Sequence, residues 1–210
     1  MHNEHYLRAE FYNALTHGAG AVLSLIGGVT LITLASLWGT AWQLTSAIVF
    51  SISLIGLYTA STLYHSTHEP KAKSRLQVLD HCMIYVLIAG SYTPFTLIAM
   101  REDGGWLIFG ITWAMAIAGI IFKLFFTGRF ELISTLLYLG MGWMVLFAAG
   151  PMLRNVGTTE LIWLGIGGFF YSFGTIFYLI DRIKHNHAIW HGFVLAGSAS
   201  HFVAISYLVL

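Results

Sequence analysis

Seven long runs of apolar residues, separated by short polar breaks, dominate the pattern along the chain. Each run has the ~20 residues that a helix needs to cross a bilayer. Because lipid offers backbone amides no water partners, such spans must satisfy their hydrogen bonds internally. We therefore predict an all-α fold, an integral membrane seven-helix bundle that forms a single domain over residues 1–210, with neighbouring helices antiparallel. The predicted spans are residues 15–38, 42–66, 78–100, 105–126, 132–151, 159–181 and 187–210.

Composition supports a membrane protein. Only 9% of the 210 residues are charged and 57% are hydrophobic, whereas soluble domains carry about 25% charged residues. The net charge of +1 gives no electrostatic basis for binding nucleic acid. The lone Cys82 excludes a disulfide within the chain. The polar start, MHNEHYLRAEFYN, lacks the pattern of a cleaved signal peptide, so we expect the first apolar segment to be retained.

The distribution of Lys and Arg predicts the orientation. Eight of these ten residues fall on one side of the predicted spans and two, Arg101 and Arg154, fall on the other. Because positive loops stay in the cytoplasm, we predict a cytoplasmic N-terminus, an outside C-terminus and a multi-pass protein of the cell inner membrane. The eight residues are Arg8, Lys71, Lys73, Arg75, Lys123, Arg129, Arg182 and Lys184, of which Lys123 and Arg129 are assigned to the fourth link.

Prolines and glycines mark expected breaks and contacts. Pro94 should kink or end the third helix, and Pro151 should end the fifth. Small residues allow helix backbones to approach closely in membranes. We expect this of glycines in the first and sixth spans, namely Gly18, Gly20, Gly27, Gly28, Gly165, Gly167, Gly168 and Gly174.

Polar and ionisable residues in or next to the spans fall at one depth, near the predicted cytoplasmic face. They lie at the end of the second span or the start of the first, third and seventh, although alternate helices could have placed them at opposite faces. Intramembrane polar groups are costly, so such a cluster suggests a functional site. The residues are Glu10, Asn13, His17, Ser61, His65, Asp80, His81, His187 and His191.

Histidine spacing points to a metal. His187 and His191 are four residues apart, so they share one face of a helix and could chelate one ion. His65 is the best third ligand. Three imidazoles with an open fourth position resemble a catalytic Zn²⁺ site, because structural zinc sites are closed by four protein ligands. Asp80 could then move a proton, and Ser61, on the same face as His65, could hold water or an oxyanion.

Other interpretations remain open for each residue. The histidine pair could be solvated or could offset a neighbouring helix dipole, Asp80 could be favoured by a helix N-terminus, and Ser61 could bond back to its own helix. His17, His68 and His81 are rival ligands, and His68 falls in a link. His201 lies about 15 Å beyond His191 along the helix, too far for the same ion, and is expected to contact Ser172 or Tyr171.

Four motifs of the chain resemble those of a known family. ASTLYH, LDHCMIYVLIAGSYTPF, NHAIWHGFVLAGSASHF and ExxNALTHGAG are similar to those of bacterial hemolysin III-type members of the progestin and adipoQ receptor family. The resemblance covers nearly the whole chain. It implies seven helices, a zinc site formed by His65, His187 and His191, and positions for Asp80 and Ser61 near the metal. Some members are associated with ceramidase activity, and others with hemolysis or membrane homeostasis.

Three functions follow as hypotheses. The first is a zinc-dependent, ceramidase-like hydrolase of lipid amides or esters that binds a membrane lipid or fatty-acyl ligand and acts in lipid homeostasis. The second is a non-enzymatic protein of membrane-fluidity or energy homeostasis, or a sensor, with structural zinc. The third is a pore-forming hemolysin, which is least favoured because no predicted helix has a charged stripe suited to lining a wide pore.

Overall fold

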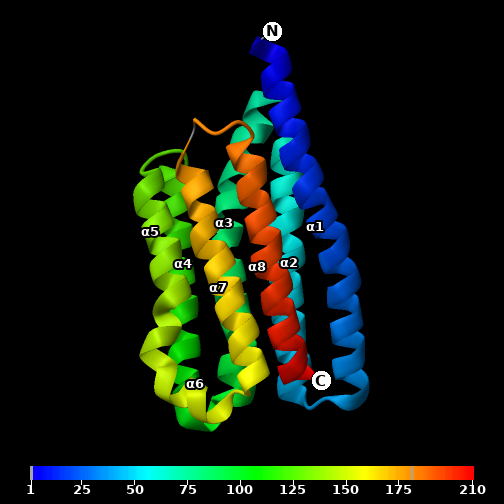
Figure 1. Cartoon of the computed structure of the whole chain (residues 1–210), viewed down its shortest axis with the longest axis vertical. Coiled ribbons are helices and arrows are strands. Elements are labelled where there is room, and N and C mark those ends of the chain that lie inside the picture. Colours follow the sequence, from blue (N-terminus) through cyan, green and yellow to red (C-terminus); the bar gives the residue numbers. More distant parts are fainter. Residues whose placement is uncertain (1, 181) are drawn as a thin grey trace.

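The protein is a bundle of long antiparallel helices in a computed structural model that describes residues 2–180 and 182–210 (Figure 1). Within these residues, seven helical segments are long and apolar enough to cross a membrane. Three of them are interrupted or extended by short π- or 3₁₀-helical pieces. The elements are α1 His2–Trp38, α2 Ala41–Ser66, α3 Pro70–Pro94, η1 Phe95–Ala99, η2 Arg101–Gly105, α4 Trp106–Phe126, α5 Glu131–Gly142, η3 Trp143–Ala148, α6 Ala149–Asn155, α7 Thr158–Leu179 and α8 Asn186–Val209.

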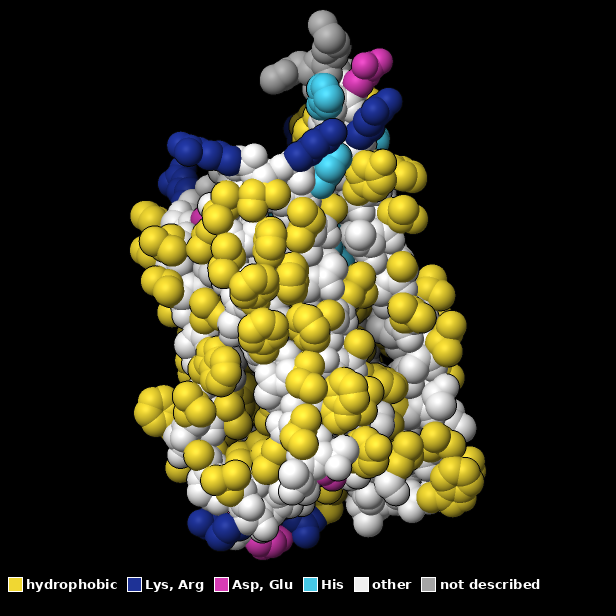
Figure 2. Space-filling view, viewed as in Figure 1, with side chains coloured by type: hydrophobic (Ala, Val, Ile, Leu, Met, Phe, Trp, Pro, Cys, Tyr) yellow, Lys and Arg dark blue, Asp and Glu magenta, His cyan; other side chains and the backbone are white. Residues whose placement is uncertain are grey.

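The outer surface matches a lipid environment. Hydrophobic side chains cover the middle of the face shown in Figure 2, and Lys and Arg gather toward its two ends. Large hydrophobic side chains such as Phe147 and Leu107 are exposed, which a water-facing surface would disfavour. The two termini lie at opposite ends of the bundle (Figure 1). The fold therefore agrees with the predicted multi-pass bundle, while the side of the membrane that each end faces stays a prediction.

Two helices begin well before their predicted starts. α1 already begins at His2, and α3 begins at Pro70 instead of residue 78. At α3, the Glu69 side chain accepts hydrogen bonds from the backbone N–H groups of Lys71 and Ala72, and Pro70 occupies the first turn, where no N–H is needed. Hydropathy locates the part of a helix inside lipid, so it misses these polar extensions.

The other predicted boundaries agree within a few residues except at the fifth span. Pro94 ends α3, as predicted. Pro151 does not end the fifth span, because it lies in the first turn of α6, where proline is tolerated, and the helix runs on to Asn155. The break comes earlier, at the 3₁₀-helical segment η3. α7 ends at Leu179, and residue 181, the predicted end, lies outside the described residues.

Lys123 corrects one detail of the predicted charge distribution. It belongs to the last turn of α4 and not to the link, and its side chain is fully buried. Its Nζ lies 5.9 Å from the ring centroid of Tyr138 on α5. The α4 helix continues to Phe126, so this lysine points into the bundle and adds no surface charge to the link.

Several of the expected glycine contacts are present. A Cβ at Gly20 would lie 2.6 Å from the Tyr58 ring, and one at Gly28 would lie 2.9 Å from Ser51. These distances are too short for any side chain, so α1 and α2 approach closely only because of glycine. Gly165 differs from this expectation, because a Cβ there would meet no atom within 4 Å.

Candidate metal centre

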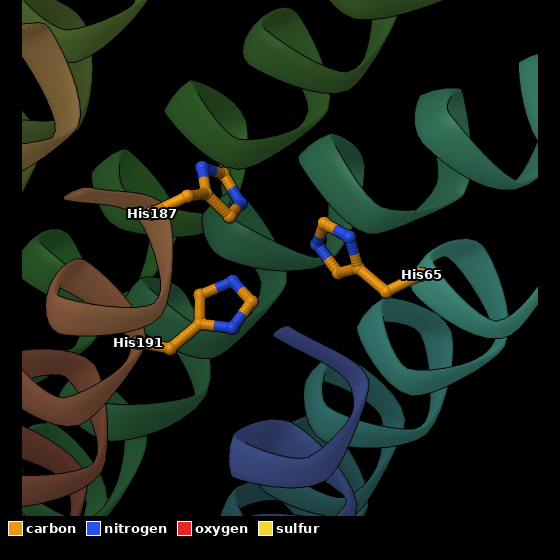
Figure 3. Close-up of side chains that lie close together, drawn as sticks. All are labelled: His65, His187 and His191. Atoms are coloured by element: carbon orange, nitrogen blue, oxygen red, sulfur yellow. The ribbon is translucent and has the colours of Figure 1, made fainter. Parts of the chain in front are cut away.

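Three histidines converge at the end of the bundle that holds the N-terminus. His65 comes from α2, and His187 and His191 come from α8 (Figure 3). One ring nitrogen of each lies within 4.8 Å of the other two. The three ring centroids are 4.6 to 5.1 Å apart. The structure thus brings together the three residues predicted as metal ligands.

Local structure explains this convergence. His65 is the penultimate residue of α2, and α8 begins at Asn186, directly after His185 in a left-handed conformation. α2 ends where α8 starts, because the two helices cross the bundle in opposite directions. The four-residue spacing then aims both α8 imidazoles at α2. His65 and His191 are almost completely buried, at 3% and 2% exposure.

The donor set fits a metal ion. A tetrahedral zinc with bonds of about 2.0–2.1 Å places its ligand nitrogens roughly 3.3 Å apart. Nitrogens already within 4.8 Å need only small side-chain rotations to reach that geometry. Among the described residues, Nε2 of His65 is buried and has no hydrogen-bond partner, which is costly unless the lone pair meets a ligand. The cluster could therefore hold a metal, and three imidazoles are a common donor set for zinc.

A cavity of about 360 Å³ begins at these histidines. His187 and His191 line one end, together with Ser61 and Asp80, and the lining continues to Met152 near the opposite end of the bundle. Most of the wall between them is aliphatic or aromatic. Lining residues on η3 and α6 are also exposed on the outer surface, so the cavity opens sideways. These are Leu146 and Leu153, with exposures of 62% and 71%.

The surroundings of Ser61 and Asp80 remove two of the alternative interpretations. Ser61 is buried, and its Oγ makes no hydrogen bond to its own helix, unlike Ser53 two turns earlier, whose Oγ donates to the Val49 carbonyl. Asp80 lies almost three turns into α3, because that helix begins at Pro70. A helix dipole acts within the first turn, so it does not account for Asp80. Whether either residue is catalytic stays a prediction.

The rival histidines occupy different positions. His68 is exposed in the link between α2 and α3. His17 of α1 stacks on His191, with ring centroids 3.4 Å apart, and both of its ring nitrogens are buried with no hydrogen-bond partner in the part of the chain that the structure describes. His81 lines the cavity. The three-histidine group that could hold a metal includes none of these.

His201 contacts Tyr171, as expected, but its ring nitrogen faces the α7 backbone and not a side-chain hydroxyl. Its Nε2 lies 3.3 Å from the carbonyl oxygen of Leu164, and its ring meets Tyr171 edge-on, at 5.3 Å between centroids. Ser172 instead accepts a hydrogen bond from Trp143. A Cβ at Gly167 would lie 2.1 Å from the His201 ring, so glycine lets the ring reach the α7 backbone.

The sequence placed Glu10 and Asn13 of α1 in the polar cluster but gave neither residue a specific role. The Glu10 carboxylate lies beside both His65 and Lys73, and the backbone carbonyl of Asn13 contacts His191. Their polar positions, three residues apart at the start of a membrane helix, were visible in the sequence. The partners of these side chains depend on the packing of α1 against α2, α3 and α8, which spacing alone does not show.

Known proteins are similar to this chain over nearly its whole length. The family described as haemolysin-III related matches residues 5–202. The chain is 46% identical to Hemolysin-3 of Bacillus cereus, over 98% of this chain and 94% of that protein. It is 44% identical to the Hemolysin-3 homolog of Bacillus subtilis (strain 168), over 95% and 93%. It is also 30% identical to the human Monocyte to macrophage differentiation factor, over 92% and 81%. The chain belongs to the haemolysin-III family, as its motifs indicated.

Proposed function

We propose that this protein is a zinc-dependent hydrolase of the cell inner membrane that cleaves an amide or ester bond of a lipid, as a ceramidase does. One observation supports this above all others. The three histidines share one end of an apolar cavity with Ser61 and Asp80. A catalytic site needs both a reactive centre and a place for its substrate, and a cavity that adjoins three candidate metal ligands supports both requirements.

The cavity suits an acyl chain. Ligand pockets usually measure about 300–1,000 Å³ and have mainly apolar walls with a few polar groups. This cavity holds about 360 Å³, with its polar groups at the histidine end. A lipid that enters from the side, past Leu146 and Leu153, would lay its chain along the wall. Its carbonyl carbon would then lie near His187 and His191.

Each polar residue has a distinct task in this proposal. Zinc on the three imidazoles supplies Lewis acidity toward the carbonyl and toward water. Asp80 accepts the proton of the attacking water and passes it to the leaving amine or alcohol. Ser61 donates a hydrogen bond to the carbonyl oxygen, which gains negative charge during attack. The Ser61 hydroxyl is available for this because, among the described residues, it donates no hydrogen bond to its own helix.

Fatty-acid release from a panel of ceramides, other lipid amides and lipid esters tests the proposal. Purified, zinc-loaded protein should release acid from at least one lipid, as measured by mass spectrometry. Asp80→Asn should lower the rate by about 10²-fold or more, in line with general acid–base catalysis. Ser61→Ala should lower it by about 10²-fold. Ser53→Ala is the matched control, because Ser53 bonds back to its own helix and does not line the cavity.

A structural metal is the second candidate. A metal bound by His65 and His187 would join α2 to α8, helices more than 100 residues apart in the chain. Metal binding coupled to folding could then stabilise a non-enzymatic homeostasis or sensor protein. Metal-loaded protein that releases no fatty acid from any lipid of the panel, yet unfolds at lower temperature without metal, would favour this function over hydrolysis.

A pore is a weaker third possibility, suggested by the name Hemolysin-3 of two relatives. The apolar wall of the cavity does not suit a wide aqueous pore. Dye leakage from liposomes at a low protein-to-lipid ratio would support it nevertheless.

A further inference from the structure

We infer that α1 forms the outer shell of the metal centre, with Glu10 as a positioning residue that sets the tautomer of His65. This inference rests on the metal site of the proposed function. Metal-binding histidines usually donate their second ring N–H to a carboxylate or carbonyl, which fixes the ring and leaves the other nitrogen free for the metal. Two contacts from one helix provide this arrangement here.

The first contact is between Glu10 and His65. Nδ1 of His65 lies 3.2 Å from Oε2 of Glu10, and both side chains are largely buried. An ionised carboxylate can only accept a hydrogen bond. The proton of the neutral imidazole must therefore be on Nδ1. This assignment leaves the lone pair on Nε2, the nitrogen that has no partner in the structure.

The second contact repeats the pattern one turn further along α1. Nδ1 of His191 lies 3.2 Å from the backbone oxygen of Asn13 and 3.1 Å from Oγ1 of Thr16. A carbonyl oxygen cannot donate, so Nδ1 of His191 also carries the proton. The Thr16 hydroxyl donates to the carbonyl oxygens of Tyr12 and Asn13, at 2.9 Å each, so its own oxygen is free to accept from His191.

Lys73 holds the carboxylate in place. Its Nζ lies 2.6 Å from the same oxygen of Glu10 and also donates to the Tyr64 carbonyl oxygen, at 3.0 Å. A charged lysine beside Glu10 favours its ionised form, which can only accept from His65. The early start of α3 at Pro70 places Lys73 within reach, since the predicted start at residue 78 would leave it in a loop.

Metal binding by Glu10→Gln tests the inference. Loss of an outer-shell partner typically weakens metal binding about 10- to 100-fold. We expect a loss in that range when purified, metal-stripped protein is titrated with Zn²⁺ alone. The amide can also donate to His65, so the Co²⁺-loaded variant should show a shifted visible absorption spectrum. If Glu10 only joined α1 to α3 through its ion pair with Lys73, the variant would change stability and leave the cobalt spectrum unaltered.

Two further variants make the result decisive. Glu4→Gln is the matched control, because Glu4 is an exposed acid on the same helix, and its affinity and spectrum should equal those of the wild type. Thr16→Val removes the hydroxyl beside His191 and should also weaken binding, which provides a second test if Glu10→Gln fails to fold. Wild-type protein that binds no metal would overturn the proposed function. Wild-type binding that Glu10→Gln and Thr16→Val leave unchanged would overturn only the role of α1.

Discussion

Zinc should stabilise the wild-type protein against heat, and His65→Ala should remove most of that stabilisation. His65 is the member of the three-histidine group that comes from α2, and its loss leaves two imidazoles on a single helix. Coordination would then no longer join α2 to α8. His68→Ala is the matched control, because His68 is exposed in the link three residues further on.

The size of the effect follows from mass action. Free zinc at 100 times its dissociation constant stabilises the folded state by about 2.7 kcal/mol. For a chain of 210 residues, each kcal/mol corresponds to about 2–4 °C, so the midpoint should rise by about 5–11 °C. Loss of an outer-shell partner weakens metal affinity by up to about 100-fold. Loss of a direct ligand should weaken zinc affinity by at least that much. The same zinc concentration then contributes only about 0.4 kcal/mol, or roughly 1–2 °C.

Intrinsic fluorescence during heating measures the unfolding midpoint, since the chain has seven tryptophans that report unfolding. Each variant is compared with itself in chelator and in zinc, which cancels any effect of the substitution on the metal-free fold. A zinc-dependent shift in His65→Ala as large as that of the wild type would refute the claim that α2 contributes a ligand. A loss of the shift in His68→Ala would assign the third ligand to the link.

Two further predictions concern the cavity and the packing of α3 on α4. Gly165→Phe should weaken binding of a fluorescent fatty-acid probe, because Gly165 lines the cavity and has open space at its Cβ position. Gly110→Phe is the control, because Gly110 is exposed on α4. Equal binding of the probe by the two variants would argue against an acyl ligand. Gly119→Val should lower the unfolding midpoint by about 2–12 °C, because a Cβ there would lie 2.3–2.5 Å from the ring of buried Tyr85 and overpacking costs about 1–3 kcal/mol. Gly110→Val should unfold like the wild type, and a normal midpoint for Gly119→Val would mean that the Tyr85 ring moves aside at little cost.

Most of the membrane-embedded fold could be predicted because its causes are local. A run of apolar residues must form a helix in lipid whatever its neighbours are. Successive spans must also alternate in direction. These two facts placed His65 at one end of its span and His187 at the start of another, and so predicted that they would lie at the same depth.

The polar extensions could not be predicted in the same way. The start of α3 depends on the capping of backbone amides by Glu69, and hydropathy does not measure capping. Likewise, Pro151 in isolation resembles a helix end. Its effect depends on the 3₁₀-helical segment η3, after which a new helix begins at Ala149, so that Pro151 lies in a first turn.

The contacts of single side chains depended on packing that no short motif encodes. His201 bonds to the Leu164 carbonyl because Gly167 exposes the α7 backbone, and spacing alone gave no reason to prefer that partner. The roles inferred for Glu10 and Asn13 also required knowing that α1 lies against the ends of both α2 and α8. The sequence therefore predicted the three candidate ligands but not the groups that hold them.

The placement of the three histidines also has a consequence for biosynthesis. His65 is added to the growing chain when less than a third of it has been made, whereas His187 and His191 belong to α8. A nascent chain holds only one of the three candidate ligands until α8 has been inserted beside α2. Binding of one ion by all three imidazoles would therefore require that α8 has been made, and a product truncated before α8 would retain only His65 of the group.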